Sequence, residues 1–249
     1  MSAAEEQAAL FPGGGPSPLS TTDPEFWAFY ADFAFDQTLA HSSLDRRDRL
    51  VYQLAATIAV GAVSEYRVLL GAALTIGVTP VQVKELTYQA VAYVGIARVV
   101  DFLFATNDEF AARGIAVPLE GQSTTTPETR AAVGRAKQEE IVGAEPVAGM
   151  YASAPDDAVH FQQFLSSNCF GDYYTRTGFD VRQRELITFA LLVALGGADN
   201  QVRGHVSANL RVGNTRADLL DVLTVLVAYV GYPRTLNGLA QVNEAAPAS

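Results

Sequence analysis

The chain repeats itself at a separation of about 135 residues, and this repeat constrains the fold more than any other feature of the sequence. The motif LDRRDR at 44–49 aligns with FDVRQR at 179–184, an offset of 135, and VAYVG at 91–95 recurs at 227–231, an offset of 136. The second copy has therefore gained one residue between these motifs. Duplicated helical units normally pack across a pseudo-two-fold axis and bury the surface between them.

Apolar residues recur at helical spacing through most of the chain, and no run alternates apolar and polar residues long enough to predict a strand. Thr79-Pro80 and Thr126-Pro127 are typical helix starts, with proline at the first helical position. The sequence therefore predicts an all-α fold: two tandem four-helix repeats related by a pseudo-two-fold, joined by a helical connector. The expected helices lie near 45–60, 63–76, 80–93, 96–113, 126–141, 156–169, 181–195, 198–212, 216–229 and 231–245.

The predicted organisation has four segments. Residues 1–22 contain PGGGPSP, which predicts a flexible arm without helix or strand. A leading helix follows from Asp23, and its aromatic stripe of Phe26, Phe29, Tyr30 and Phe33 is expected to pack in the core. The first repeat with its leading helix is expected to span 23–113, the connector 114–178, with an irregular stretch at 143–155 and a polar loop at 171–180, and the second repeat 179–245.

Charge and cysteine content exclude several classes of function. The chain has 17 basic and 27 acidic residues, a formal net charge of −10, which argues against nucleic acid or an anionic membrane surface as the main partner. Cys169 is the single cysteine, so neither a disulfide framework nor a cysteine-built metal site is available. No signal peptide or apolar run of membrane-spanning length is evident, and we expect a cytoplasmic location.

Several motifs resemble the carboxymuconolactone decarboxylase family, which shares its all-helical fold with the alkylhydroperoxidase D proteins. The connector is similar to that of the two-copy bacterial members, and the likeness covers about residues 24–245. The resemblance implies the fold, whereas the family's activities include decarboxylases, peroxidase-system reductases and members of unknown chemistry. The motifs are GQSTTTPETR (121–130), NCFGDYYTR (168–176), RELIT (184–188), ALGG (194–197), GHV (204–206), VGNT (212–215) and AYVGYPRTLN (228–237).

The sequence departs from the peroxidase branch, which carries a CxxC pair one helical turn ahead of a histidine. The corresponding positions ahead of His205 are Ala198 and Gln201, and neither is a thiol. Dithiol chemistry needs an attacking and a resolving thiol, so the chain is not expected to be a thiol peroxidase. The first copy has Leu50 where the second has Glu185, and we expect the second copy to supply most of any site.

Glu185 and His205 are the predicted catalytic pair. Glu185 lies 11 residues before Gly196 and His205 lies 9 residues after it. At ~1.5 Å per residue, both lie roughly 13–17 Å from that turn, so an antiparallel hairpin brings them to the same height. A carboxylate beside an imidazole fixes the tautomer and suits general acid–base catalysis. The alternative is a buried hydrogen-bonded pair that only orients two helices.

Further side chains are candidates for substrate binding. Arginines bind carboxylates bidentately, and tyrosines on a loop beside a rigid scaffold offer hydroxyl groups. Core packing remains the alternative for Tyr229, and a small buried apolar role the alternative for Cys169. The predicted substrate-binding residues are Arg234, Arg203, Arg176, Tyr173, Tyr174, Tyr229 and Cys169.

The leading hypothesis is a cofactor-independent decarboxylase-like lyase that acts on a small carboxylated, conjugated or lactone substrate. The alternatives are a non-catalytic oligomeric helical protein that binds a small hydrophobic metabolite, and a related lyase or isomerase of secondary metabolism. No metal is expected, because the three histidines show no ligand spacing. We expect a homo-oligomer, a trimer or a dimer. A solvent-connected cavity with His205, Glu185 and an arginine would favour the enzyme.

Overall fold

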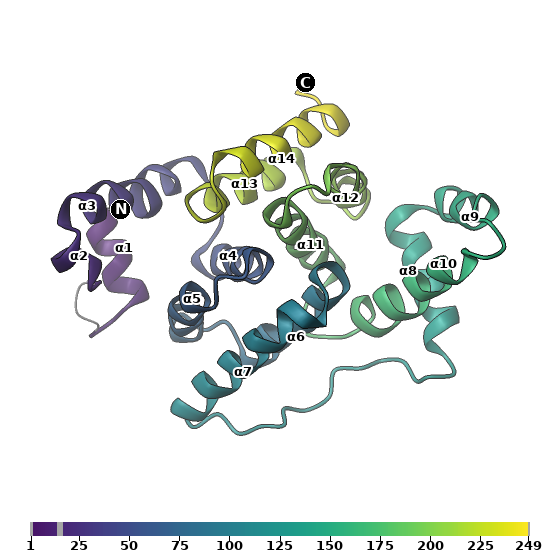
Figure 1. The fold of residues 1–249 in the computed structure, drawn as a ribbon, viewed down its shortest axis with the longest axis horizontal. Coiled ribbons are helices and arrows are strands. Elements are labelled where there is room, and N and C mark those ends of the chain that lie inside the picture. Colours follow the sequence, from purple (N-terminus) through teal and green to yellow (C-terminus); the bar gives the residue numbers. More distant parts are fainter. Residues whose placement is uncertain (1, 14–16, 249) are drawn as a thin grey trace.

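The computed structural model describes residues 2–13 and 17–248, and every regular element in those ranges is helical (Figure 1). The all-α prediction is therefore confirmed. The elements are α1 (Ala3–Leu10), α2 (Leu19–Thr22), α3 (Pro24–Asp32), the π-helix η1 (Phe33–Gln37), the 3₁₀-helix η2 (Leu39–His41), α4 (Arg46–Val60), α5 (Val63–Thr75), α6 (Pro80–Val94), α7 (Ile96–Ala112), α8 (Arg130–Val142), α9 (Ala144–Ala152), α10 (Val159–Phe164), the π-helix η3 (Leu165–Tyr174), α11 (Val181–Leu195), α12 (Asp199–Arg211), α13 (Arg216–Val230) and α14 (Tyr232–Ala245).

The repeated motifs mark the same helix starts in both copies. Asp45 caps α4 and Asp180 caps α11, each through its carboxylate to the backbone N–H three residues on. Thr79 and Thr215 cap α6 and α13 in the same way. Such caps satisfy backbone N–H groups that have no partner within the helix, which explains why these short motifs recur at fixed offsets.

The two copies pack about a central helix pair. Helix α4 lies against its equivalent α11, and the two are side by side at the centre of Figure 1. Helix α4 also packs on α13 of the second copy, while α11 packs on α6 of the first. Each of the two central helices thus contacts both α6 and α13, which is the arrangement that a pseudo-two-fold produces. Residues of α6 are therefore placed beside the second copy's first helix.

The residue gained by the second copy lies in the turn between α11 and α12. Gly61 and Ala62 separate α4 from α5, whereas Gly196, Gly197 and Ala198 separate α11 from α12. The φ angles are 73° at Gly196 and 70° at Gly197, in the left-handed region that glycine adopts without strain.

The leading helix belongs to the repeat in both copies. In the first copy α3 continues into the π-helix η1, and in the second α10 continues into the π-helix η3. Helix η1 packs on α13, and η3 packs on α6. In each copy, a helix that continues into a π-helix therefore precedes the four repeated helices.

Three local predictions were wrong. The arm 1–22 contains α1 and α2, because Ser2 and Glu5 form a capping box and Leu10 is buried against the core; its residues 14–16 lie outside the described ranges. The irregular stretch 143–155 contains α9. The polar loop expected at 171–180 is helical to Tyr174.

The aromatic stripe of α3 does not fill the core as expected. The exposed fractions are 45% for Phe26 and 61% for Phe29. Tyr30 and Trp27 do pack against the core cluster. Of this stripe, Tyr30 packs against the core, whereas Phe26 and Phe29 leave an apolar surface at this end of the molecule.

The connector positions η3 through a close helix crossing. A Cβ on Gly134 of α8 would lie 2.1 Å from the backbone oxygen of Ser166, and one on Gly171 would lie 2.3 Å from that of Arg130. Only glycine allows two backbones to approach this closely. Helix η3 is thereby held at a fixed depth against α8, and it carries Cys169 and Tyr174 toward α6 and α11.

Candidate active site

Glu185 and His205 form a pair across the α11–α12 hairpin. His205 Nδ1 lies 2.8 Å from Glu185 Oε2, as the spacing on either side of Gly196 predicts. The Glu185 side chain is fully buried, whereas 18% of the His205 side chain is exposed. A buried carboxylate thus holds an imidazole that reaches the surface.

Two tyrosines complete the surroundings of this carboxylate. The Tyr174 hydroxyl donates to Glu185 Oε1 at 2.7 Å, and the Tyr93 hydroxyl donates to the Tyr174 oxygen at 3.0 Å. Thr188 Oγ1 is 2.6 Å from the same Tyr174 oxygen. The single hydroxyl proton of Tyr174 is already used in the hydrogen bond to Glu185. The Thr188 hydroxyl is therefore the donor in its hydrogen bond to the Tyr174 oxygen. Burial raises the pKa of Tyr93 and of Tyr174 well above the usual tyrosine range, so both hydroxyls remain protonated donors.

These contacts define the role available to the imidazole. An ionised carboxylate only accepts hydrogen bonds, so His205 Nδ1 carries a proton and points it at Glu185. The other nitrogen, Nε2, is then the group that can take up or release a proton. The Tyr93 ring meets the imidazole edge-to-face, with 5.8 Å between centroids, and restricts its orientation.

Cys169 lies next to this pair but is not an activated thiol. It is 8% exposed, and its sulfur is 3.8 Å from the Tyr93 hydroxyl. Burial raises the pKa of the thiol to about 12. The pattern is that of a small buried apolar residue rather than a nucleophile.

Alkylation measures this protection directly. At pH 8 a thiol with this pKa is ionised to about one part in 10⁴, against about a quarter for an ordinary cysteine. We expect iodoacetamide to modify Cys169 ~10³-fold more slowly in the folded protein than in the guanidinium-unfolded protein. Intact-mass spectrometry measures both rates. Rates within tenfold of each other would contradict the burial of this thiol.

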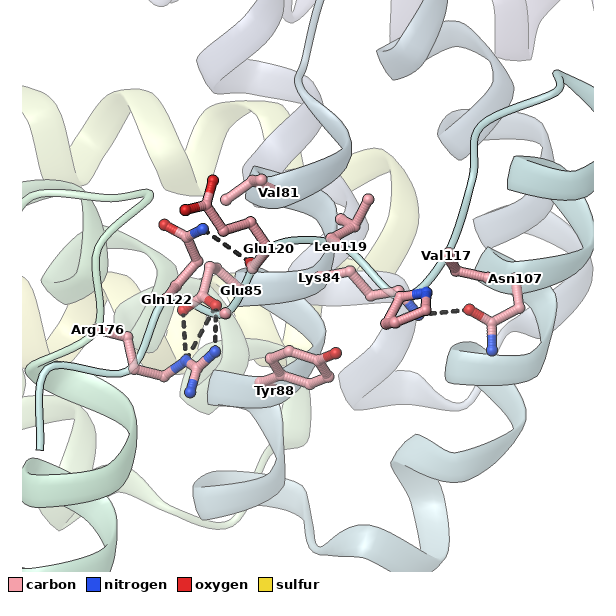
Figure 2. Close-up of a pocket in the computed structure, with 12 residues that line it drawn as sticks. Val81, Lys84, Glu85, Tyr88, Asn107, Val117, Leu119, Glu120, Gln122 and Arg176 are labelled. Carbon is pink, nitrogen blue, oxygen red and sulfur yellow. Dashed lines mark hydrogen bonds and ion pairs between the residues drawn. The ribbon is translucent and has the colours of Figure 1, made fainter. Parts of the chain in front are cut away.

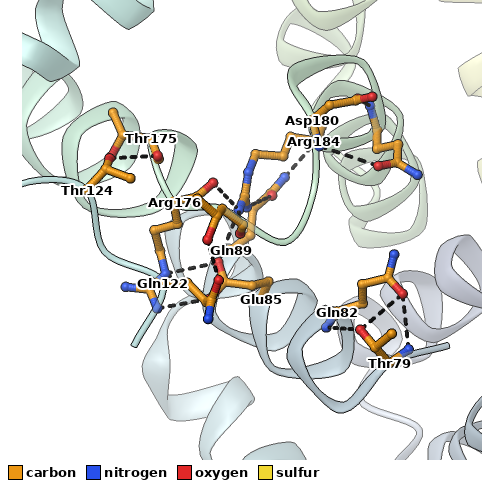
Figure 3. A network of polar contacts seen from close by, with 12 residues as sticks. Thr79, Gln82, Glu85, Gln89, Gln122, Thr124, Thr175, Arg176, Asp180 and Arg184 are labelled. Atoms are coloured by element: carbon orange, nitrogen blue, oxygen red, sulfur yellow. Dashed lines mark hydrogen bonds and ion pairs between the residues drawn. The ribbon is translucent and has the colours of Figure 1, made fainter. Parts of the chain in front are cut away.

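A buried ion cluster lies further along the α6–α11 seam (Figure 3). The Glu85 carboxylate, 1% exposed, accepts hydrogen bonds from Arg176 at 2.9 and 3.0 Å and from Arg184 at 3.1 Å. Arg184 also donates to Gln89, whose amide donates to Thr188 at 3.0 Å. Because Thr188 contacts Tyr174, a continuous polar network joins Glu85 to the Glu185–His205 pair.

The three predicted arginines lie at three separate positions in the structure. Arg176 binds Glu85, in the cluster just described. Arg203 lies on the α12–α14 seam, where it contacts Gln241 and Glu244. Arg234 lies over the α11–α12 turn, so close that a Cβ on Gly196 would be 3.0 Å from its Nε. These contacts do not gather the three arginines around His205.

The three predicted tyrosines also lie at different positions. Tyr174 contacts Glu185 directly, whereas Tyr173 is half-buried on η3, with a hydrogen bond to Asn168. Tyr229 instead bonds to Tyr30 of the first copy's leading helix. Tyr93 is not among the predicted residues, although it is equivalent to Tyr229 in the repeated VAYVG motif. Tyr93 lies on α6, which packs on α11 and so brings this residue close to Glu185. Tyr229 lies on α13, which packs in the equivalent way on α4 of the first copy.

The first copy has no such pair. Leu50 occupies the position of Glu185, and Leu69 that of His205, since α5 and α12 align at an offset of 136. Both leucines are buried, Leu50 completely. The second copy alone therefore carries the carboxylate–imidazole pair.

Three cavities that are large enough for a small ligand lie away from His205. One of about 390 Å³ lies beside Lys84, Glu85 and Arg176. One of about 600 Å³ lies between His41 and α13–α14, and one of about 580 Å³ lies among the aromatic residues of the N-terminal helices. The imidazole itself reaches solvent, with 18% of its side chain exposed.

Fold and site define a duplicated all-α protein in which one copy carries a carboxylate–imidazole pair completed by residues of the other. The chain belongs to the carboxymuconolactone decarboxylase family, whose sequence profile matches residues 24–108 and 160–244. The two matched ranges begin 136 residues apart, and both include the leading helix.

Two known proteins extend this comparison. The chain is 31% identical over 94 residues to a 4-carboxymuconolactone decarboxylase of Acinetobacter baylyi, a match that covers 38% of this chain and 69% of that protein. It also resembles a crystal structure from Burkholderia xenovorans, provisionally described as a gamma-carboxymuconolactone decarboxylase subunit. The TM-score is 0.53 at 21% identity, over 96% of this chain and 94% of the other, which supports the fold alone.

In residues 2–13 and 17–248, no three His, Cys, Asp or Glu side chains are grouped so that they could hold a metal ion. Within the same ranges, no helix has both the length and the apolar character that crossing a bilayer requires.

Proposed function

We propose that the protein is a cofactor-independent lyase that decarboxylates a small carboxylated, conjugated or lactone substrate, with His205 as the proton donor. Family membership supports decarboxylase-like chemistry, and the named relative acts, by its name, on 4-carboxymuconolactone. The observation that carries the proposal is the 2.8 Å contact of a buried Glu185 with a partly exposed His205.

The proposed reaction needs no external oxidant or reductant. The bond between carbon and carboxylate breaks, CO₂ leaves, and the electron pair passes into the conjugated carbonyl of the substrate, which forms an enolate. The imidazolium Nε2–H of His205 then delivers a proton to carbon. Glu185 stabilises the imidazolium through Nδ1, and the imidazole regains a proton from water. Overall, one carboxylate group and one proton are consumed, and one C–H bond and one CO₂ molecule are formed.

The test is an assay in D₂O with 4-carboxymuconolactone and related carboxylated lactones. If His205 donates the proton, CO₂ is released and one deuteron appears in a single configuration at the enolate carbon that is protonated. Deuterium in both configurations would show that bulk water protonates the enolate. Absence of CO₂ release from every substrate of this class would contradict the proposal.

One observation favours the non-catalytic alternative, a helical protein that binds a small hydrophobic metabolite. The cavity of about 580 Å³ is lined by Phe11, Phe26, Trp27, Tyr30 and Phe35. Its size and lining suit an apolar ligand. Saturable binding of apolar aromatic ligands, with no turnover of carboxylated lactones, would support this alternative. The homo-oligomer expected from the sequence remains part of the proposal, and the exposed Phe26 and Phe29 would suit a contact between subunits.

A further inference from the structure

The cavity of about 390 Å³ lies apart from the His205 pair, beside the other end of the polar network (Figure 2). One face of α6 forms its floor, with Val81, Lys84, Glu85 and Tyr88 at helical spacing. The connector segment 117–122 covers it, and Arg176 closes one end. Its volume is at the lower end of the range for small-molecule sites, roughly 300–1,000 Å³.

Lys84 is an unusual residue to find in such a place. It is 8% exposed, its ammonium donates to Asn107 Oδ1, and it lies 5.6 Å from the centre of the Phe110 ring. An ammonium has three N–H donors, and Asn107 is its one hydrogen-bond partner among the described residues. A buried charge is costly unless it is paired and hydrogen-bonded, so the site calls for an anionic acceptor. Burial also lowers the pKa of Lys84, in keeping with an ammonium that lacks a counter-ion.

A second positive group lies at the opposite end of the cavity. Two arginines, Arg176 and Arg184, share the single carboxylate of Glu85, so this cluster retains one positive charge. Arg176 is its more exposed member, at 18% of its side chain, and it lines the cavity. Lys84 and Arg176 thus place two cationic groups on the cavity, and Glu120, an exposed residue of the covering segment, is the further carboxylate on its lining.

The space between the two cations is flat and apolar. Figure 2 shows the Tyr88 ring between the Arg176 guanidinium and Lys84. Arg176 also lies 5.3 Å from the centre of that ring. Val81, Val117 and Leu119 supply apolar walls, and the polar side chains of Glu120 and Gln122 lie on the covering segment. A ligand that fits has a compact apolar body with an anionic group at each end.

We propose that this cavity binds a small organic dicarboxylate, one carboxylate on Lys84 and the other on Arg176, with the body against Tyr88. The site is separate from His205 and does not depend on the proposed decarboxylation. The connector segment 117–122 is the part of the chain that a bound ligand would contact from above.

The chain offers a direct probe, because Lys84 and Lys137 are its only lysines. Protein labelled with ¹³Cε-lysine therefore gives two side-chain signals in an NMR titration. We expect succinate or phthalate to shift the Lys84 signal saturably, while the signal of Lys137, which is paired with Glu140 outside the cavity, stays in place. Benzoate, with one carboxylate, should bind more weakly. Equal shifts of both lysines, or no saturable shift with either dicarboxylate, would overturn the proposal.

Variants separate this site from the His205 site. Loss of a charge-assisted hydrogen bond should weaken dicarboxylate binding ~10- to 100-fold in Lys84→Met, measured by calorimetry. Lys137→Met is the matched control and should bind as the wild type does. His205→Asn should also bind normally even if it abolishes turnover. Binding lost in His205→Asn but kept in Lys84→Met would place the dicarboxylate at the other site and refute the assignment. The titration of the wild-type protein decides the matter if Lys84→Met does not fold.

Discussion

Asparagine in place of His205 is expected to reduce turnover ~10²–10⁴-fold, the usual contribution of one general acid–base side chain. The melting temperature should stay close to that of the wild type, because 18% of the imidazole is exposed and asparagine keeps a hydrogen-bond donor toward Glu185. The measurements are kcat/KM on any substrate that the wild type turns over, and thermal unfolding of the same preparations.

Glu185→Gln should lose less activity than His205→Asn. Glu185 acts through the imidazole, and glutamine still offers a carbonyl oxygen to Tyr174 or to His205 Nδ1. His160→Asn is the control: the His160 ring contacts the rings of Phe161 and Phe164 on the same helix, α10, and its replacement should not affect turnover.

The opposite pattern would identify a structural pair. Breaking a buried hydrogen bond then costs about 1–3 kcal/mol of unfolding free energy, while turnover by the folded fraction is unchanged. Melting temperature and turnover, measured on the same two variants, therefore separate the catalytic role from the structural one.

The helical fold and its duplication could be predicted because both depend on local signals. The caps at Asp45 and Asp180 and the one-residue gain in the second copy are visible in the sequence alone. The Glu185–His205 contact follows from counting residues on either side of a glycine turn. The N-terminal helices were missed because a glycine- and proline-rich stretch dominates that segment, while burial of Leu10, a tertiary effect, stabilises α1.

The rest of the site depends on contacts between the two copies. Residue spacing within one copy does not predict such contacts. Tyr93 precedes His205 by more than a hundred residues, and the packing of α6 on α11, between the two copies, brings it to the Glu185–His205 pair. The repeat does carry a signal for Tyr93, because Tyr93 is equivalent to Tyr229 in the VAYVG motif. The positions of the arginines could not be predicted for a different reason: a guanidinium pairs with whichever carboxylate the packing supplies, which is Glu85 for Arg176 and Glu244 for Arg203.

Removing the charge of Glu85 should have the largest effect on stability. Glu85 and Arg184 are each 1% exposed, so Glu85→Gln leaves a buried guanidinium without its counter-ion. Breaking such a pair typically costs about 3–5 kcal/mol. Glu109→Gln is the matched control, because Glu109 and Arg113 form a partly exposed pair at 2.6 Å, and such pairs contribute about 0–1 kcal/mol. Urea unfolding of the two variants measures both values.

The cluster also determines where the connector joins the second repeat. Arg184 donates to the backbone oxygens of Arg176 and Thr177 at 2.9 Å, just ahead of α11. In Glu85→Gln, amide hydrogen exchange should therefore accelerate first around 174–180, while the α4–α11 pair stays protected until global unfolding. Adding Arg184→Met to Glu85→Gln removes the stranded charge, so the double variant should lose less stability than the two single losses added together. Strict additivity of the two losses, or a Glu85→Gln loss no larger than that of Glu109→Gln, would show that Glu85 and Arg184 are not coupled in the folded protein.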